Sequence, residues 1–418
     1  MVRRRVRQRG LPFMSLISFR RQARTPWLPL RVSSSALALL FLTPFLFTTA
    51  RSQVAPADEP IHLLFVGDMM HHKAQDKLAG QHKEGRVAGY LGMWEPVGPR
   101  IQAADLAVAN LECPITGGPI SHYPRFNGPP EYLQALRSVG FDVLTLANNH
   151  AMDKGLEGFG ATFGNVVGAG MLPAGDGRPV RVIVKGRTVS ILSVTMLANQ
   201  GANWKVPEGR VGPYLVRYRL ADERAGLVKR VREMALDSDL VVVSFHWGIE
   251  YVRDPPRWIR AWARELAEAG ADVIIGHHPH VAGPIEWITR EDGKQTLVAY
   301  SLGNFSSGMI RGSEPLGYIL ELRVSADGRL NPEVRMIWTA ADSDNKRWRS
   351  FRTVMVDDLE ADCAERAERL RTRTAGPENG PLMSRTGAAP HECQRYRNGL
   401  VPFKKFRPGT IADPVITP

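Results

Sequence analysis

The stretch VIIGHHPH, residues Val273–His280, decides the fold and the chemistry expected of this chain. A short β-branched run ends at Gly276, and three histidines follow within four positions. Continuous apolar runs of this length are typical of buried parallel strands. The histidines then lie on the loop after a strand, where open α/β sheets bind their ligands. We therefore expect a functional site on this loop.

Three other apolar runs also end in Asp, Asn or His. They are Ile61–Asp68 (IHLLFVGD), Val143–His150 (VLTLANNH) and Leu240–His246 (LVVVSFH). A further strand is expected over Asp105–Asn110, just before Glu112. Because the carboxyl ends of parallel strands meet at one edge of a sheet, the pattern predicts a metal centre built from loops at one edge of a single sheet. Gly67 is expected to let the backbone turn sharply before Asp68.

Helical segments alternate with these strands, which predicts an α/β sandwich. The expected helices are Pro130–Val139, Ala221–Ala235 and Trp258–Ala269, and further strands are expected over Gln295–Ser301 and Tyr318–Val324. A hairpin over Val180–Val194, with its turn at Lys185-Gly186, makes the sheet mixed. The pattern decays after residue 345, so we expect one domain over 61–345 and a partly irregular C-terminal extension over 346–418.

The charge of the chain is concentrated at its N-terminus. Residues 1–50 carry nine arginines and no acidic residue, and without those arginines the net charge falls from +12 to +3. This distribution argues against a nucleic-acid partner. The basic region precedes an apolar run, Ala36–Thr49, which predicts a signal peptide or, alternatively, a retained N-terminal membrane anchor. Residues 51–60 read as a linker, and we expect an exported, periplasmic or otherwise extracytoplasmic protein.

Two smaller features leave alternatives open. The pair Arg20-Arg21 is either a twin-arginine signal or part of a basic leader region. Cys363 and Cys393 either pair in an oxidising compartment, which leaves Cys113 as the odd thiol, or are free.

Six side chains form a ligand set that suits divalent cations: Asp68, Glu112, Asn149, His246, His278 and His280. Carboxylate, amide and imidazole donors are compatible with Zn²⁺, Mn²⁺ and Fe and do not choose among them. A carboxylate can bridge two cations about 3.5–4 Å apart, which together hold a hydroxide and polarise a phosphoryl or carbonyl oxygen. His278 and His280 are two residues apart, so in extended chain both emerge on one side.

Each residue also has a purely structural interpretation. An Asp after a strand often caps a helix, and an Asn-Asn pair often makes a turn. His71, His72 and His277 either support the metal ligands, contact the substrate, or are ordinary surface histidines. Asp153 either orients His150 through a hydrogen bond or caps the following helix.

The motifs GDMMHH, NLECPIT, LANNHAMDKG, FHWGIEY, GHHPHV and YSLGNF follow one another in this order. This series, from Ile61 to Gly308, resembles the CapA or poly-γ-glutamate capsule biosynthesis family, which is similar to the calcineurin-like metallophosphoesterases. The resemblance implies a four-layer α/β/β/α metallophosphoesterase-like sandwich with mixed sheets. It also implies two divalent metal ions.

The resemblance assigns roles to matching positions. It implies that Asp68 and His280 bind the first metal, that Glu112 bridges, and that the second metal is held by Asn149, His246 and His278. His150 would contact a phosphoryl oxygen or protonate the leaving group, with Asp153 as its catalytic partner, and substrate contacts are expected from His72, His277 and Asn304. Two positions depart from the pattern: Met70 stands where phosphoesterases carry a histidine, unless His72 substitutes, and the bridging acid is Glu rather than Asp.

Three functions follow as expectations. The first is an exported metal-dependent hydrolase- or transferase-like protein in the synthesis or export of an anionic capsule polymer of the poly-γ-glutamate type. The second is a non-catalytic, polymer-binding accessory subunit of a membrane synthase, which Met70 favours. The third is a metallophosphodiesterase acting on a small phosphoester.

Overall fold

Two β-sheets form the centre of the computed structural model, which describes residues 17–18, 59–199, 206–311, 313–344 and 347–358. The first sheet has seven strands in the order β1-β6-β7-β8-β9-β11-β10. Their bounds are β1 Ile17–Ser18, β6 Val180–Val184, β7 Arg187–Thr195, β8 Leu240–His246, β9 Val273–His277, β11 Gln295–Ala299 and β10 Ile285–Thr289.

The second sheet has eight strands in the order β15-β14-β13-β2-β3-β4-β5, and β12 also pairs with β2. Their bounds are β15 Arg347–Met355, β14 Leu330–Asp344, β13 Leu316–Val324, β2 Ile61–Met69, β3 Leu106–Leu111, β4 Val143–Thr145, β5 Leu172–Ala174 and β12 Asn304–Ser306. Strand β2 is parallel to β3 and antiparallel to β13, so the sheet is mixed.

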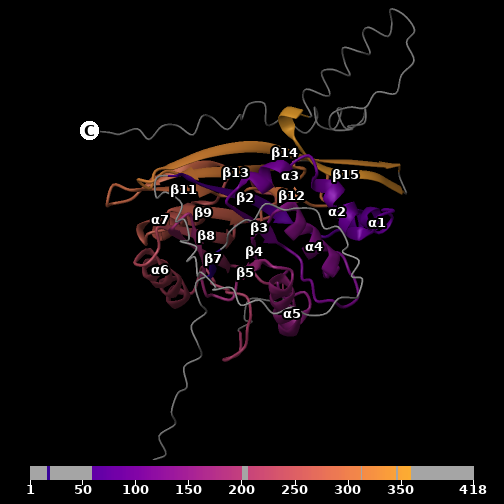
Figure 1. Cartoon of the computed structure of the whole chain (residues 1–418). Helices are drawn as coiled ribbons and strands as arrows, with labels where there is room; N and C mark the ends of the chain where they lie inside the picture. The colour runs from indigo at the N-terminus through magenta and orange to yellow at the C-terminus, as the bar shows by residue number, and fades with distance from the viewer. Residues whose placement is uncertain (1–16, 19–58, 200–205, 312, 345–346, 359–418) are drawn as a thin grey trace, which may run out of the picture.

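The helices cover the outer faces of the two sheets. Figure 1 shows α6 and α7 on one side of the molecule, and α1, α2, α4 and α5 on the other. The bounds are α1 Lys73–Gly80, α2 Arg86–Trp94, α3 Gly98–Ala103, α4 Pro130–Val139, α5 Gly155–Gly168, α6 Ala221–Ala235 and α7 Arg257–Glu268. Within the described residues, no helix combines the length and apolar character needed to cross a membrane.

Three apolar cores separate the four layers. Successive side chains of a strand point to opposite faces, so one strand supplies two cores. On β2, Phe65 joins the core between the sheets and Leu64 joins the core beneath α1–α5. On β8, Val242 joins the core between the sheets and Val243 joins the core beneath α6 and α7. The expected four-layer α/β/β/α sandwich with mixed sheets is confirmed.

Several local predictions agree with the structure. Helices α4 and α6 have the predicted bounds, and β6 and β7 form the predicted antiparallel hairpin. Its turn residues Lys185 and Gly186 have φ of 46° and 82°, the left-handed backbone of a tight hairpin turn. Within the predicted strand Val143–His150, only Val143–Thr145 is a strand, because the chain leaves the sheet at Leu146.

The prediction of a single sheet is wrong. The strands that lead to the site divide between the two sheets, with β2, β3 and β4 in one and β8 and β9 in the other. A strand covered by helices on one face and by a second sheet on the other is buried on both faces. It therefore has the same continuous apolar pattern as a strand between two helical layers.

Several expectations fall outside the described residues. One is the predicted leader within 1–50, of which only β1 is described. The others are the cysteines Cys363 and Cys393. Cys113 is buried and free. The sheet continues past residue 345 into β15, which pairs with β14 as far as Met355.

Candidate metal centre

The carboxyl ends of strands from both sheets meet at one place, where the six predicted ligands lie. All six are buried, with 0–6% of each residue exposed. Five of them supply the donor atoms of two groups, one of Glu112, His278 and His280 and one of Asp68, Glu112 and His246. Glu112 belongs to both groups, as expected of a bridging carboxylate. The groups cut across the expected division, which placed His278 with His246 and His280 with Asp68.

Glu112 follows β3, and one of its carboxylate oxygens lacks a hydrogen-bond partner. Its Oε1 is buried and has no hydrogen-bond partner, although His246 Nε2 lies 3.6 Å away and His280 Nε2 lies 3.7 Å away. Burial, together with the charge of Asp68, raises the pKa of Glu112 well above its ordinary value. A carboxylate so placed is stabilised by a cation that also binds the two imidazoles.

Asp68, near the end of β2, differs from Glu112 because both of its carboxylate oxygens have partners. Asn110 Nδ2 and the His278 backbone N–H donate to it over 2.8 and 3.3 Å, and the Nδ1 atoms of His277 and His280 each lie 3.1 Å from its oxygens. Burial alone raises its pKa, but the hydrogen bonds from His277 and His280 outweigh burial. The pKa of Asp68 is therefore held well below its ordinary value, and the group is a carboxylate anion.

The imidazoles next to the two carboxylates are kept neutral or charged by their surroundings. Burial and the neighbouring His280 lower the pKa of His278 to about 3, and burial and His278 lower that of His246. Burial lowers the pKa of His280, but its hydrogen bond with Asp68 raises it overall. Neutral His246 and His278 can offer a lone pair to a cation without first losing a proton.

The predicted route by which His278 and His280 reach the centre is wrong, although both arrive there. Their φ values are 96° and 56°, so the chain around Pro279 is left-handed rather than extended. The two ring centroids lie 6.1 Å apart. The left-handed backbone at both residues, and not the alternation of a strand, brings both rings to Glu112.

Asn149 and His150 point in different directions, as expected for neighbours. Asn149 Oδ1 lies 2.9 Å from His246 Nε2, which places it beside the metal-binding group. His150 Nδ1 lies 2.8 Å from Asp153 Oδ2, and the same oxygen accepts the Phe126 backbone N–H over 2.8 Å. Asp153 therefore orients His150, the first of its two predicted roles.

The predicted substrate residues lie close by, but protein contacts occupy much of their polar surface. His72 Nδ1 accepts the Gly308 N–H over 3.0 Å, and Asn304 Oδ1 lies 3.1 Å from His280 Nδ1 while its amide donates to two backbone carbonyls. His277 contacts Asp68 as described above. His71 is fully buried, and its Nε2 lies 2.8 Å from the Tyr90 hydroxyl, so it is a core residue and not a surface histidine.

Three asparagines that the sequence reasoning missed join the parts of the centre. Asn110 donates to Asp68 over 2.8 Å and to Glu112 over 3.4 Å, and Asn148 Nδ2 donates to Asn110 Oδ1 over 3.3 Å. Asn199 contacts both Asn149 and His150. Asn110 could have been found, because it stands two residues before Glu112 on one strand. No sequence signal marks Asn199.

Gly67 serves a different purpose from the predicted turn. It stays within β2, at a register shift between β2 and β3. A Cβ at this position would lie 1.9 Å from the carbonyl oxygen of Gly303, and that carbonyl accepts the Asp68 N–H over 2.9 Å. The absence of a side chain lets the 303 loop approach closely and fix Asp68.

The fold and the site together define a four-layer α/β/β/α sandwich with a buried carboxylate–histidine cluster that could hold a metal ion. The sequence profile of one family, described as bacterial capsule synthesis protein PGA_cap, matches residues 62–309. The chain belongs to that family, as the motif series predicts.

Individual relatives support the same membership. The PGA biosynthesis protein CapA of Bacillus subtilis is 32% identical over 289 residues, which cover 65% of this chain and 70% of that protein. The capsule biosynthesis protein CapA of Bacillus anthracis is 28% identical over 259 residues, covering 59% and 60%. A probable polyglutamine synthesis accessory protein of Mycobacterium tuberculosis is 28% identical over 200 residues, covering 44% and 52%. The matches thus span between about half and about two thirds of these relatives.

Proposed function

We propose that this chain is an exported, metal-dependent hydrolase- or transferase-like protein that acts in the synthesis or export of poly-γ-glutamate. One observation carries the metal dependence: the buried Glu112 Oε1 has no hydrogen-bond partner and faces the Nε2 atoms of His246 and His280. A buried anion left in this way is unfavourable without a cation. The ligand types fit Zn²⁺, Mn²⁺ or Fe, and two such ions could share Glu112.

The cations would supply Lewis acidity and a bound hydroxide to a carbonyl or phosphoryl group. The protein residues have three tasks around them. Asp68 and Glu112 would supply oxygen donors, and His246, His278 and Asn149 would supply neutral donors. His280 would bind through its Nε2 atom, while its Nδ1 atom faces Asp68. Asn110 sets the distance between the two carboxylates, because its amide contacts both. The surrounding burial keeps bulk water from screening these charges.

His150 is placed to move a proton. With Nδ1–H donated to Asp153, the opposite ring nitrogen is free to hold or release a proton at the substrate. Asp153 is itself held by the Phe126 N–H, and Phe126 packs edge-on against His150 with centroids 4.7 Å apart. The imidazole is thus fixed in both orientation and tautomer, as a general acid requires.

The polymer assignment rests on family membership and on the names of the relatives, two of which are capsule or poly-γ-glutamate biosynthesis proteins. A cationic centre would attract the carboxylates of such a polymer. Export is proposed from the composition of residues 1–50, where nine arginines precede an apolar run.

Complementation of a capsule-deficient deletion strain tests the proposal. We expect the wild-type chain to restore polymer, while the variants Glu112→Gln and His150→Gln fail to do so although they accumulate as folded protein. His82→Gln, at an exposed histidine outside the centre, is the matched control and should complement fully. Retained complementation by His150→Gln would overturn the catalytic role.

A second candidate is a non-catalytic accessory that binds polymer for a membrane synthase. Met70, in place of a histidine ligand, and the relative named as an accessory protein favour it. The same experiment separates the two, since an accessory tolerates His150→Gln. Metal content measured on the purified protein adds an independent criterion, because an accessory without a working centre need not retain a divalent cation.

A further inference from the structure

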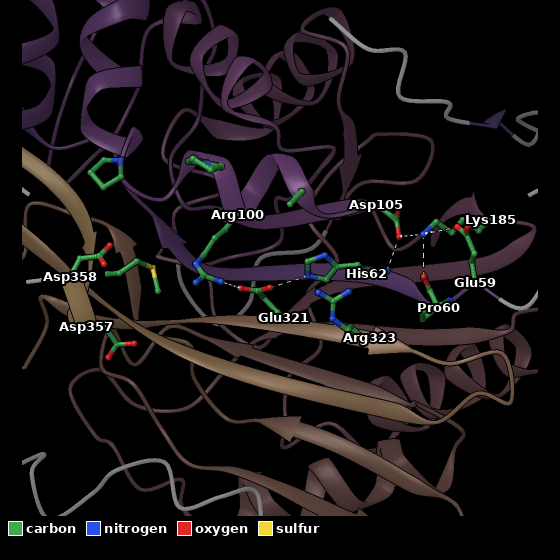
Figure 2. Close-up of a pocket in the computed structure, with 14 residues that line it drawn as sticks. Glu59, Pro60, His62, Arg100, Asp105, Lys185, Glu321, Arg323, Asp357 and Asp358 are labelled. Atoms are coloured by element: carbon green, nitrogen blue, oxygen red, sulfur yellow. Dashed lines mark hydrogen bonds and ion pairs between the residues drawn. The ribbon is translucent and has the colours of Figure 1, made fainter. Parts of the chain in front are cut away.

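A cavity of about 800 Å³ lies at the start of β2, at the opposite end of the strand from Asp68 (Figure 2). Its buried charges pair within the protein: Arg100 donates to Glu321 over 2.8 Å, and Lys185 lies 3.0 Å from Asp105 Oδ2. This cavity therefore makes little demand for a ligand. The surface that the proposed chemistry leaves unused lies instead at the mouth of the metal centre.

Apolar side chains gather at that mouth. In the part of the chain that the structure describes, eight large apolar residues are exposed, and Tyr123, Ile249, Tyr251 and Val252 are four of them. Tyr251 shares the turn after β8 with Ile249 and Val252, and its ring centroid is 6.3 Å from that of His280. These four exposed residues together form the rim. Single exposed apolar residues are ordinary, but a group of them beside a site indicates a binding surface.

Tyr123 forms the other side of the rim. Its ring centroid lies 6.3 Å from that of Phe126, which packs on His150 at 4.7 Å. Burial raises the pKa of Tyr251, and the nearby Tyr123 adds to the rise, so the two tyrosines lie close together. The rim therefore joins the wall that holds the proposed general acid to the wall that holds a candidate metal ligand.

The backbone fixes the position of Tyr251. Its φ is 64°, which is uncommon for a residue with a large side chain. The Tyr251 N–H donates to the Pro279 carbonyl over 2.8 Å, and the Trp247 N–H donates to the His277 carbonyl over 3.1 Å. Strained backbone of this kind persists only where the surrounding structure holds it, and it is frequent at functional sites. The loop thus holds an exposed ring, 53% accessible, at a set place beside the ligand-bearing turn.

The charges beside the rim indicate which part of a ligand lies there. After burial, the charges of Glu250 and Glu314 contribute most to the raised pKa of Tyr251, so both carboxylates are near its hydroxyl. A further anionic group would be repelled on this wall. A hydrocarbon chain or an aromatic ring gains free energy there by leaving water and packing against Tyr251.

We propose that the metal centre takes an amphiphilic anion, with a phosphoryl head group at the centre and an apolar chain or ring directly attached to it against the rim. A lipid phosphate belongs to this class. The rim and the centre are continuous through His280 on one wall and through Phe126 and His150 on the other, so one molecule can occupy both. This ligand class depends on the metal centre proposed above and not on the polymer assignment.

Calorimetric titration of the intact protein in excess Mn²⁺ tests the ligand class. The probes are methylphosphonate, phenylphosphonate and octylphosphonate, which share one head group and have no ester to hydrolyse. We expect at least one of the two larger compounds to bind about tenfold or more tightly than methylphosphonate, because the rim removes its apolar part from water. The tighter of the two identifies a planar ring or an extended chain as the favoured group.

The outcomes separate the rim from the centre. If methylphosphonate binds as tightly as both larger compounds, the rim takes no part in binding and the ligand class is wrong, while the metal centre stands. If none of the three binds to the protein in excess Mn²⁺, both the ligand class and the proposed centre fail.

Substitutions in the rim then locate the apolar part. Asparagine tolerates left-handed backbone, so Tyr251→Asn removes the ring and keeps the turn. Tyr251→Asn and Val252→Ser should each reduce the preference for the larger compound over methylphosphonate by about threefold or more. Leu236→Asn is the matched control and should keep the full preference, because Leu236 is 87% exposed just after α6, at the far end of β8 from His246.

The preference is a ratio measured on one preparation, so a variant that is only partly folded cannot imitate its loss. A preference that stays unchanged in both rim variants, or that falls equally in Leu236→Asn, refutes the assignment of the apolar part to the rim.

Discussion

The change Glu112→Gln should have opposite effects on the metal-free and the metal-bound protein. The substitution keeps the shape of the side chain and removes its negative charge. In the metal-free protein burial and the nearby Asp68 make that charge unfavourable, and one oxygen of the side chain has no hydrogen bond. Leaving a buried polar group unsatisfied costs about 1–3 kcal/mol, and more for a charged one. We therefore expect Glu112→Gln to raise the free energy of unfolding in EDTA by about 1–3 kcal/mol.

With metal present the sign reverses. A ligand that binds only the native state at 100 times its Kd adds about 2.7 kcal/mol to the free energy of unfolding, and at 1,000 times its Kd about 4.1 kcal/mol. Wild type should gain stability of this order with Zn²⁺ or Mn²⁺. The variant should gain much less, because Glu112 belongs to both groups of donor atoms. The two unfolding curves should therefore change order when metal is added.

Chemical denaturation in EDTA and in excess metal measures both effects on the same preparation. Glu291→Gln is the control, since Glu291 is exposed and distant in the fold, and it should be neutral in both conditions. Glu112→Gln could instead destabilise the metal-free protein and leave the metal-induced gain in the free energy of unfolding intact. Glu112 would then be neither an unfavourable buried charge nor a metal ligand, and the reasoning would fail.

Two further predictions concern packing and protonation. Gly67→Ala should lower the free energy of unfolding by about 3 kcal/mol, because its Cβ would meet the backbone oxygen of Gly303 at 1.9 Å. Gly92→Ala is the control and should not destabilise the protein, because nothing lies within 4 Å of the added Cβ. Equal denaturation midpoints for the two variants would contradict this account. Burial lowers the pKa of His71 to about 3, so the unfolded chain takes up a proton from about pH 6.5 downward while the native state does not. Wild type should accordingly lose about 2 kcal/mol more stability than His71→Gln between pH 6.5 and pH 5, measured by urea denaturation, and parallel losses would show that His71 is protonated in the native state.

Much of the fold could be predicted from periodicity and from turn residues. Helix α4 begins at Pro130 and ends before Gly140, whose φ of 125° suits glycine, and both signals are visible in the sequence. The division into two sheets could not be predicted from the residues, because burial on both faces has the same apolar pattern in either arrangement. It followed from the family resemblance. Strand β12 was also missed, since Asn304–Ser306 pairs with β2 over only three residues.

The sequence could predict which residues form the site, but not which of them contact one another. Strand-end position was enough to find six side chains that meet at one place in the fold, because a rigid sheet fixes where its loops begin. The left-handed backbone at His278 and His280 has no sequence signal, since neither residue is glycine or asparagine. Contacts between distant loops, such as that of Asn199 with Asn149, depend on the path of the whole chain. Sequence thus identifies the donors, and only the tertiary structure shows which donors share an atom.

The two carboxylates of the candidate centre differ in how fully the protein itself satisfies them. Asp68 is saturated by hydrogen bonds and imidazoles, so it ties β2 to the loop after β9 whether or not a cation is bound. This saturation also accounts for the tolerance of Met70, whose buried side chain offers its sulfur to the Ser307 hydroxyl at 3.6 Å instead of serving the centre. Glu112 has no such support at Oε1. A cation therefore adds little to the position of Asp68 and much to the charge balance of Glu112. For this reason we expect metal removal to leave the loops in place while it destabilises the protein.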